Sequence, residues 1–390
     1  MSRLDGSHLL RERAHDKAAR VTSVELFFDL VFVFAVTQLS HTLLKQLDPV
    51  GALQVGLLFM ATWWVWIYTV WAANWFDPEK PAVRAALFAL LAAGLLMSVS
   101  IPRAFEELGW LFGAAIALQQ VGRTLAMLAA SRGEEPAMRR NFQRMTVWLA
   151  AAGALWIAGG LAAPEQRFAW WLGALAVDLA APMLMYFVPG LGRSSLADWN
   201  VDGSHMAERC ALFVIIALGE SLLVAGATFA ELPMDWANGA GFLLAVLGTI
   251  LMWWLYFGHG AGQGHHRIVH SHTPGRHARN NFTYLHVPIV AGIIVSAVGD
   301  ELVLSHPAHG SAAAMAAITG GPLLFLCGTA LFKWLAHTRR LPPLSHLAGI
   351  AALALLAALA VPLHLSPLLA SGITVAVLLC VAVWESCVLR

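Results

Sequence analysis

Ionisable side chains lie inside long apolar stretches of this sequence, where they could bind or relay a cation or a proton. Glu25 and Asp29 stand one helical turn apart in the first stretch, so they share one face of a helix. Glu220 lies near the middle of the seventh stretch. A charge at a bilayer centre costs roughly 2.5–3.5 kcal/mol, so each such acid needs a cationic partner, a proton or a wet path.

Further ionisable residues complete the candidate set. Asp178 lies near the middle of the sixth stretch, four residues before Pro182, and a proline frees a backbone carbonyl about one turn earlier. Glu208 and Arg209 begin the seventh stretch, and since helix neighbours face different directions, we expect each to find its own partner. His286, in the ninth stretch, is a candidate base. The predicted ion or substrate path comprises Glu25, Asp29, Asp178, Glu208, Arg209, Glu220 and His286.

Purely structural explanations compete with these roles. Thr22-Ser-Val-Glu25 has the pattern of a capping box, in which Glu25 bonds back to the Thr22 amide. Glu220 could be a protonated carboxyl bonded to a neighbouring helix. Arg123, in the fourth stretch, is a candidate counter-ion for one of the buried acids. Asp300 lies at the outer end of the ninth stretch, where solvation explains it.

The composition indicates the environment of these residues. Of 390 residues, 59% are hydrophobic and 12% are charged, and the mean hydropathy is +0.68. An average soluble domain carries about 25% charged residues, so a soluble globular protein and a disordered one are both disfavoured. The net charge of +1 argues against nucleic acid as a partner. The four cysteines lie in apolar stretches without C-x-x-C, which argues against a disulfide framework or a Cys-based zinc site.

Twelve apolar stretches are long enough to cross a bilayer as helices, which need about 20 apolar residues. They span 23–44, 51–74, 82–101, 108–130, 142–162, 168–190, 206–230, 236–258, 281–304, 312–336, 344–363 and 366–387. With the N-terminus in the cytoplasm, all of the 24 Lys and Arg residues except Lys45, Arg103 and Arg167 fall on the cytoplasmic side. We therefore predict an all-α polytopic protein of the cell (inner) membrane, embedded in the lipid bilayer, with both termini cytoplasmic.

Two parallel six-helix repeats are predicted within this array. The first and seventh stretches both begin with an acid and continue into a Phe/Val/Ile run, and the second and eighth share a Trp-Trp pair with a tyrosine close behind. Parallel repeats of this kind occur in secondary transporters, with the site between the halves. The predicted divisions are a cytoplasmic tail at 1–22, a first half at 23–190, a cytoplasmic linker at 191–205 and a second half at 206–390.

A histidine-rich stretch separates the eighth and ninth apolar stretches. Six of the 16 histidines lie between residues 259 and 277. Metal binding by such a tract is conceivable, but no H-E-x-x-H and no nearby acid completes a catalytic zinc site. We favour a flexible basic loop and predict no metal site and no cofactor.

The chain resembles the bacterial low temperature requirement A family over nearly its whole length, and three segments carry the resemblance. The first is Val24-Glu-Leu-Phe-Phe-Asp-Leu-Val-Phe-Val-Phe-Ala-Val-Thr-Gln-Leu-Ser-His41. The second is Ala207-Glu-Arg209 followed by Leu212-Phe-Val-Ile-Ile-Ala-Leu-Gly-Glu-Ser221. The third is Tyr284-Leu-His-Val-Pro288 with Gly292. The resemblance implies the fold and the importance of these residues, but it implies no biochemical activity.

Three functions follow from these observations. The first is a cation- or proton-linked transporter or channel in which Asp29 and Glu220 bind or relay the ion, and Glu25, Glu208 and Arg209 gate the inner end. The second is a membrane-embedded enzyme acting on lipids, with His41 or His286 as a base beside an acid. The third is a structural or sensory protein whose acids form closed ion pairs. Homo-oligomer formation stays open.

Overall fold

The computed structural model describes residues 9–11, 21–132, 135–195, 202–258, 279–337 and 341–388. Most of the predicted tail at 1–22, part of the predicted linker at 191–205 and the whole histidine-rich stretch at 259–277 lie outside these described residues. The described part is all-α apart from two isolated antiparallel bridges, Leu10 with Phe76 and Val188 with Gly192. The predicted all-α class is confirmed.

Each of the twelve predicted stretches is helical in the described part of the chain. The first six are α1 (Ser23–Lys45), α2 (Pro49–Trp75), α3 (Pro81–Ser100) with the 3-10 turn η2 (Ile101–Arg103), the continuous α4 (Gly109–Ala117), η3 (Leu118–Gly122) and α5 (Arg123–Ala130), α6 (Pro136–Leu161) and α7 (Pro164–Met183). The last six are α8 (Gly203–Glu231), α9 (Trp236–Phe257), the π-helical η5 (Arg279–Tyr284) leading to α12 (His286–Ser305), α13 (Ala312–His337), α14 (Leu344–Ala360) and α15 (Pro367–Val388).

Ten of these helices in the described residues are long and apolar enough to cross a membrane. The exceptions are α14, which has 17 residues, and α7, which carries Glu165, Arg167 and Asp178 within 20 residues. The sixth stretch was expected to stay helical to residue 190, but α7 ends at Met183. Pro182 precedes this end, and the following turn is closed by the Tyr186 N–H donating to the Ala181 carbonyl at 2.8 Å.

The chain forms two compact units. The first unit contains residues 1–42 and 50–209, and the second contains residues 43–49 and 210–390. The division falls inside α8, directly after Arg209. The two parallel repeats and their boundaries stay predictions.

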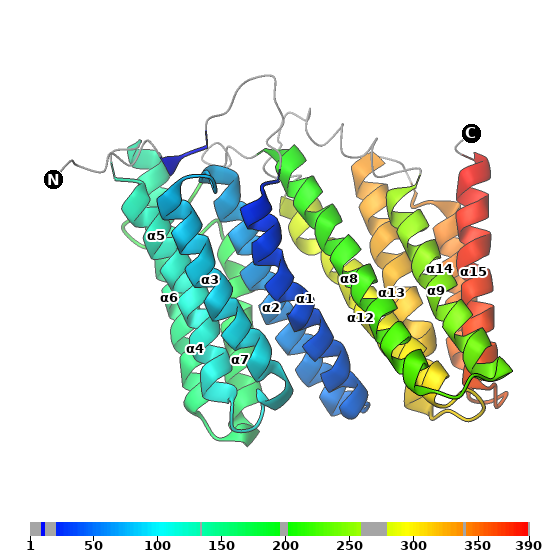
Figure 1. Ribbon diagram of the computed structural model, residues 1–390. Coiled ribbons are helices and arrows are strands. Elements are labelled where there is room, and N and C mark those ends of the chain that lie inside the picture. The colour runs from blue at the N-terminus through cyan, green and yellow to red at the C-terminus, as the bar shows by residue number, and fades with distance from the viewer. Residues whose placement is uncertain are drawn as a thin grey trace. The chain divides into compact units, whose positions relative to one another are not determined.

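Aromatic side chains fill the first unit, whose helices α1 to α7 run alongside one another in Figure 1. Trp63, Trp64 and Trp66 of α2 are at most 1% exposed. Trp156 of α6 and Trp171 of α7 are fully buried against each other, with ring centroids 5.9 Å apart. The tryptophans of α2 therefore pack in the protein interior. A buried indole N–H usually finds a hydrogen-bond partner there.

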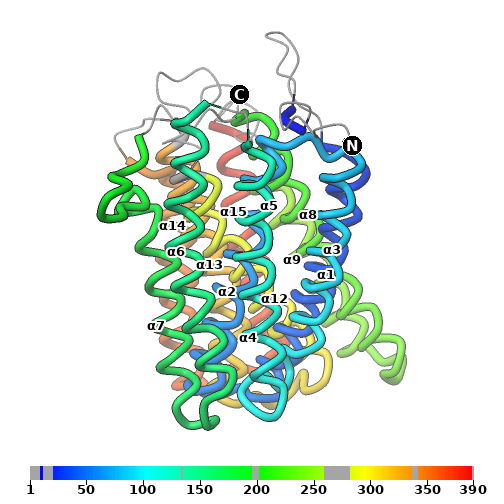
Figure 2. Tube along the Cα trace, turned by 90° about the vertical axis from the view of Figure 1, so that its left-hand side faces the viewer, coloured from blue at the N-terminus to red at the C-terminus, as the bar shows by residue number. Residues whose placement is uncertain are grey.

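Glycines bring α12 and α13 of the second unit into backbone contact (Figures 1 and 2). A Cβ added at Gly292 would lie 2.5 Å from the Phe325 amide nitrogen, and one at Gly321 would lie 2.5 Å from the Ser296 amide nitrogen. Both approaches are closer than any side chain allows, so these positions require glycine. Close approach through small residues is the usual packing mode of helices in membranes.

Candidate functional site

A reciprocal cap holds Glu25 at the start of α1. The Thr22 amide and hydroxyl donate to Glu25 Oε2 at 2.8 and 3.0 Å, and the Glu25 amide donates to Thr22 Oγ1 at 3.4 Å. This is the geometry of a capping box. Arg11 Nη2 also lies 3.4 Å from Glu25 Oε2. One carboxylate oxygen of Glu25 is therefore engaged locally, and the other remains for more distant partners.

Arg209, near the start of α8, contacts both acids of α1. Its Nη1 donates to Glu25 Oε1 at 3.0 Å, and its Nη2 donates to Asp29 Oδ1 at 2.5 Å. Because the two acids are one turn apart, the planar guanidinium can reach both at once. Neither carboxylate is exposed, and Arg209 is 1% exposed. Its guanidinium carbon lies 6.0 Å from the centroid of the Trp66 ring.

His205 is the second partner of Glu25, and an oriented amide lies on its other side. The Asn74 amide is oriented by two bonds to Asp202, because Oδ1 accepts from the Asp202 amide and Nδ2 donates to the Asp202 carbonyl, each at 2.9 Å. Asn74 Nδ2 then faces His205 Nδ1 at 3.3 Å, so this ring nitrogen accepts. On its other side, His205 Nε2 lies 2.7 Å from Glu25 Oε1, so the imidazole bridges the Asn74 amide and this carboxylate.

The two carboxylate oxygens of Asp29 have different surroundings. Its Oδ1 accepts from Trp66 Nε1 at 2.8 Å and from Arg209. Its Oδ2 is buried and accepts no hydrogen bond from any residue that the structure describes. The Nε of Arg209 likewise has no acceptor in the described part of the chain. Buried polar atoms normally have hydrogen-bond partners, so Asp29 Oδ2 can accept one further donor or cation.

Asp178 belongs to a separate buried polar group in the same unit. Its Oδ2 accepts from Trp156 Nε1 at 2.9 Å, while its Oδ1 has no donor among the described residues. Pro182 offers no N–H to the backbone carbonyl of Asp178. Arg123, the candidate counter-ion, donates to Thr69 Oγ1 at 3.0 Å and makes no direct ion pair within the described residues, although its charge interacts with that of Asp178. Asp178 therefore lies outside the Arg209 cluster.

The remaining predicted residues have separate surroundings. Glu208 is exposed and accepts from the Val21 amide at 3.3 Å, so it and Arg209 do have different partners. Glu220, in the second unit, is 5% exposed and has no hydrogen bond or ion pair with a described residue. His286, also in the second unit, is buried with its Nε2 2.7 Å from the Tyr256 hydroxyl. His286 is therefore hydrogen-bonded through Nε2 to the phenol of Tyr256. The enzyme hypothesis expected an acid as its partner.

Comparison with known proteins identifies the family. Residues 20–383 match the model of the bacterial low temperature requirement A protein (LtrA). The chain belongs to this family. An uncharacterized protein of Rhizobium meliloti (strain 1021) is 40% identical over 388 residues, which cover 98% of this chain and 93% of the relative. No solved structure matches the chain. The protein is thus an integral, multi-pass membrane protein of the LtrA family, and the resemblance seen in its first, seventh and ninth stretches is confirmed.

Three partners in the LtrA-family cluster were not predicted from the sequence. His205 falls in the predicted linker because α8 begins at Gly203, ahead of the apolar stretch. A signal was present, since His205 and Arg209 are four residues apart and so match the spacing of the two acids on α1. Trp66 and Asn74 carried no comparable signal, because α2 contains several tryptophans and a lone amide has no characteristic spacing.

Proposed function

We propose that this LtrA-family protein is a cation- or proton-linked membrane transporter or channel, and that Asp29 takes up the ion. The observation that carries the proposal is the Oδ2 atom of Asp29, which is buried within a candidate membrane span and accepts no hydrogen bond from a described residue. An intramembrane carboxylate of this kind is expensive to maintain and typically marks an ion or proton path.

The charges of the cluster support uptake of a positive ion. Glu25 and Asp29 share the guanidinium of Arg209, and His205 contacts Glu25 but not Asp29. A second cation, Arg11, lies 3.4 Å from Glu25 Oε2. It contacts Glu25, which already has more hydrogen-bond partners than Asp29. Asp29 is therefore the under-compensated acid, and a proton or a small cation at Oδ2 would complete its coordination.

Glu220 is proposed as a second ion-accepting acid. It lies in the span Gly203–Glu231, is nearly buried, and has no counter-ion in the described residues. A carboxyl with these surroundings is neutralised by a proton or a transient cation more readily than it is kept charged. We further propose that both termini lie in the cytoplasm, which would put the start of α1 and the Glu25 cap near the inner surface.

The first test is ion flux through the purified protein in liposomes. Wild type and Asp29→Asn would be compared under imposed proton, sodium and potassium gradients, with Glu79→Gln as the control because Glu79 is exposed and loses the same charge. We expect flux for wild type and Glu79→Gln, and loss for Asp29→Asn, because an amide keeps the acceptor for Trp66 but cannot take up the ion.

A second variant tests the role of Asp29 if the Asp29→Asn protein does not fold. Trp66→Phe removes one donor to Asp29 Oδ1 without changing any charge, so it should alter the rate or the pH dependence of flux while transport persists. Wild-type flux that is retained in full by a well-folded Asp29→Asn would contradict the role of Asp29.

A second candidate function is a closed structural or sensory cluster. Two observations favour it. Both carboxylate oxygens of Glu25 have partners, and the side chains of Glu25, Asp29 and Arg209 are almost completely buried. Removing one member of a buried ion pair typically costs about 3–5 kcal/mol, so such a cluster would act in folding. This function predicts no flux in the wild type and a large loss of stability in Asp29→Asn.

A further inference from the structure

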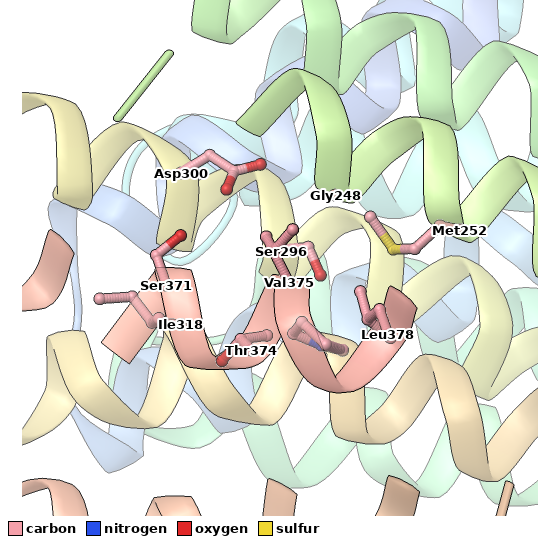
Figure 3. A pocket seen from close by; sticks show the side chains of 10 residues that line it. Gly248, Met252, Ser296, Asp300, Ile318, Ser371, Thr374, Val375 and Leu378 are labelled. Atoms are coloured by element: carbon pink, nitrogen blue, oxygen red, sulfur yellow. The ribbon is translucent and has the colours of Figure 1, made fainter. Parts of the chain in front are cut away.

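A small pocket lies in the second unit, between α9, α12, α13 and α15 (Figure 3). It has room for about one or two water molecules. Apolar side chains form much of its wall, and its oxygen-bearing side chains are Ser296, Asp300, Ser371 and Thr374. The sequence had suggested that Asp300 is simply solvated at a helix end. The structure corrects this, because Asp300 is mostly buried and lines the pocket.

Two oxygen groups in this pocket have no partner among the described residues. Asp300 makes no hydrogen bond or ion pair with any residue that the structure describes. Thr374 is 4% exposed, and its hydroxyl has no hydrogen-bond partner in the described chain. Other buried threonines of this unit donate to the carbonyl one turn earlier, as Thr319 does to Met315 at 2.8 Å and Thr329 to Phe325 at 2.9 Å. The Thr374 hydroxyl has no such bond and remains available in the pocket.

A proline in the pocket wall also leaves one backbone carbonyl without its usual helical donor. Pro322 lies inside α13 and has no N–H to donate to the carbonyl of Ile318, one turn earlier. Both residues line the pocket. Ser296 donates its hydroxyl proton to the Gly292 carbonyl at 2.8 Å, which leaves the lone pairs of its oxygen available. Carbonyls released by helix interruptions coordinate cations in transporters.

We propose that this pocket binds one small monovalent cation of the sodium or lithium class. The Asp300 carboxylate supplies the negative charge, and Ser296, Thr374 and the Ile318 carbonyl supply neutral oxygens. Ser371, on the same face of α15 as Thr374, adds a further hydroxyl to the wall. The proposal concerns equilibrium binding within the second unit, and it does not require that Asp29 carry an ion.

The ligand chemistry favours a hard monovalent ion. All the groups are oxygens, which suits alkali and alkaline-earth cations better than softer transition metals. The described residues bring no group of three His, Cys, Asp or Glu side chains together, and one carboxylate balances one positive charge. The Ser296 hydroxyl is also closely packed against α13. A Cβ at Gly321 would lie 2.6 Å from Ser296 Oγ, so glycine at this position leaves room for the hydroxyl.

Thermal unfolding of the detergent-purified protein in different salts tests this site. A ligand that binds only the folded state raises Tm as its concentration rises. We expect Tm to increase with sodium or lithium chloride over choline chloride at equal ionic strength, and less with potassium chloride. Asp300→Asn should weaken the apparent affinity for Na⁺ about tenfold or more, since a charge-assisted contact is lost.

Matched variants separate binding from folding. Thr374→Val removes the free hydroxyl at constant volume and should reduce the sodium effect, while Thr374→Ser should retain it. Glu301→Gln changes the neighbouring acid, which does not line the pocket, and should respond to Na⁺ as wild type does. Equal Tm values in sodium and choline for the wild type, or an undiminished sodium response in a folded Asp300→Asn, would overturn the proposal. Neither result depends on whether the protein transports ions.

Discussion

Arg209 is a buried cation that holds two acids from one face of α1, and its guanidinium geometry matters as much as its charge. Nη1 and Nη2 reach different carboxylates at 3.0 and 2.5 Å. An ammonium is a single compact centre and cannot reproduce this fork. The position should therefore reject lysine.

Arg209→Lys should destabilise the protein strongly although it keeps the charge. Disrupting a buried ion pair costs about 3–5 kcal/mol, and the substitution would leave one acid without its cation. Thermal unfolding in detergent would measure the change. Arg103→Lys is the matched control, because Arg103 pairs with Glu107 on an exposed surface, where such pairs contribute about 0–1 kcal/mol. Equal Tm losses in the two variants would contradict the assignment.

Individual acids were easier to find from the sequence than their partners. Glu25, Asp29 and Glu220 stand out because a charge inside an apolar stretch is costly. Asn74 and Trp66 have ordinary explanations on α2, and only the packing of α2 against α1 and α8 shows that they bond to His205 and Asp29. Arg123 shows how much a sequence leaves open, since its direct hydrogen bonds go to hydroxyl and carbonyl oxygens while its charge still acts on Asp178.

Helix positions were predictable at the element scale, while some helix ends were not. Apolar stretches located all twelve helices because the bilayer sets their length. The helix α6 begins at Pro136, ahead of the apolar stretch predicted from 142, because polar residues continue a helix beyond the bilayer core. The end of α7 at Met183 depends on Pro182 and the turn after it, which apolar content does not report.

Packing of α12 on α13 gives an element-scale prediction. Gly292→Ala would place a Cβ 2.5 Å from the Phe325 amide nitrogen, so the helices must separate. Overpacking of this kind typically costs about 1–3 kcal/mol, and Tm should fall. Gly320→Ala is the control, since a Cβ there meets nothing within 4 Å, and alanine in a helix is favoured over glycine by roughly 0.5–1 kcal/mol. A Gly292→Ala protein as stable as Gly320→Ala would show that the close contact is not required.

The whole molecule is an LtrA-family membrane protein with ten long apolar helices in its described part, and its orientation is open to direct measurement. The distribution of Lys and Arg predicts that the turn near Glu79 is cytoplasmic and the turn near Glu107 is on the opposite side. Alkaline phosphatase fused after residue 107 should be active, and the same enzyme fused after residue 79 should be inactive. The opposite pattern would invert the proposed topology.

Ion movement across the membrane is the central claim at this scale, and flux in proteoliposomes tests it most directly. Purified wild type would be compared with protein-free liposomes and with Glu220→Gln under proton, sodium and potassium gradients. The account predicts flux of at least one of these ions through the wild type. It also predicts loss of that flux in a Glu220→Gln protein that unfolds at the wild-type temperature, because glutamine cannot accept a proton or pair with a cation. Wild-type flux no greater than that of protein-free liposomes under all three gradients would contradict the account.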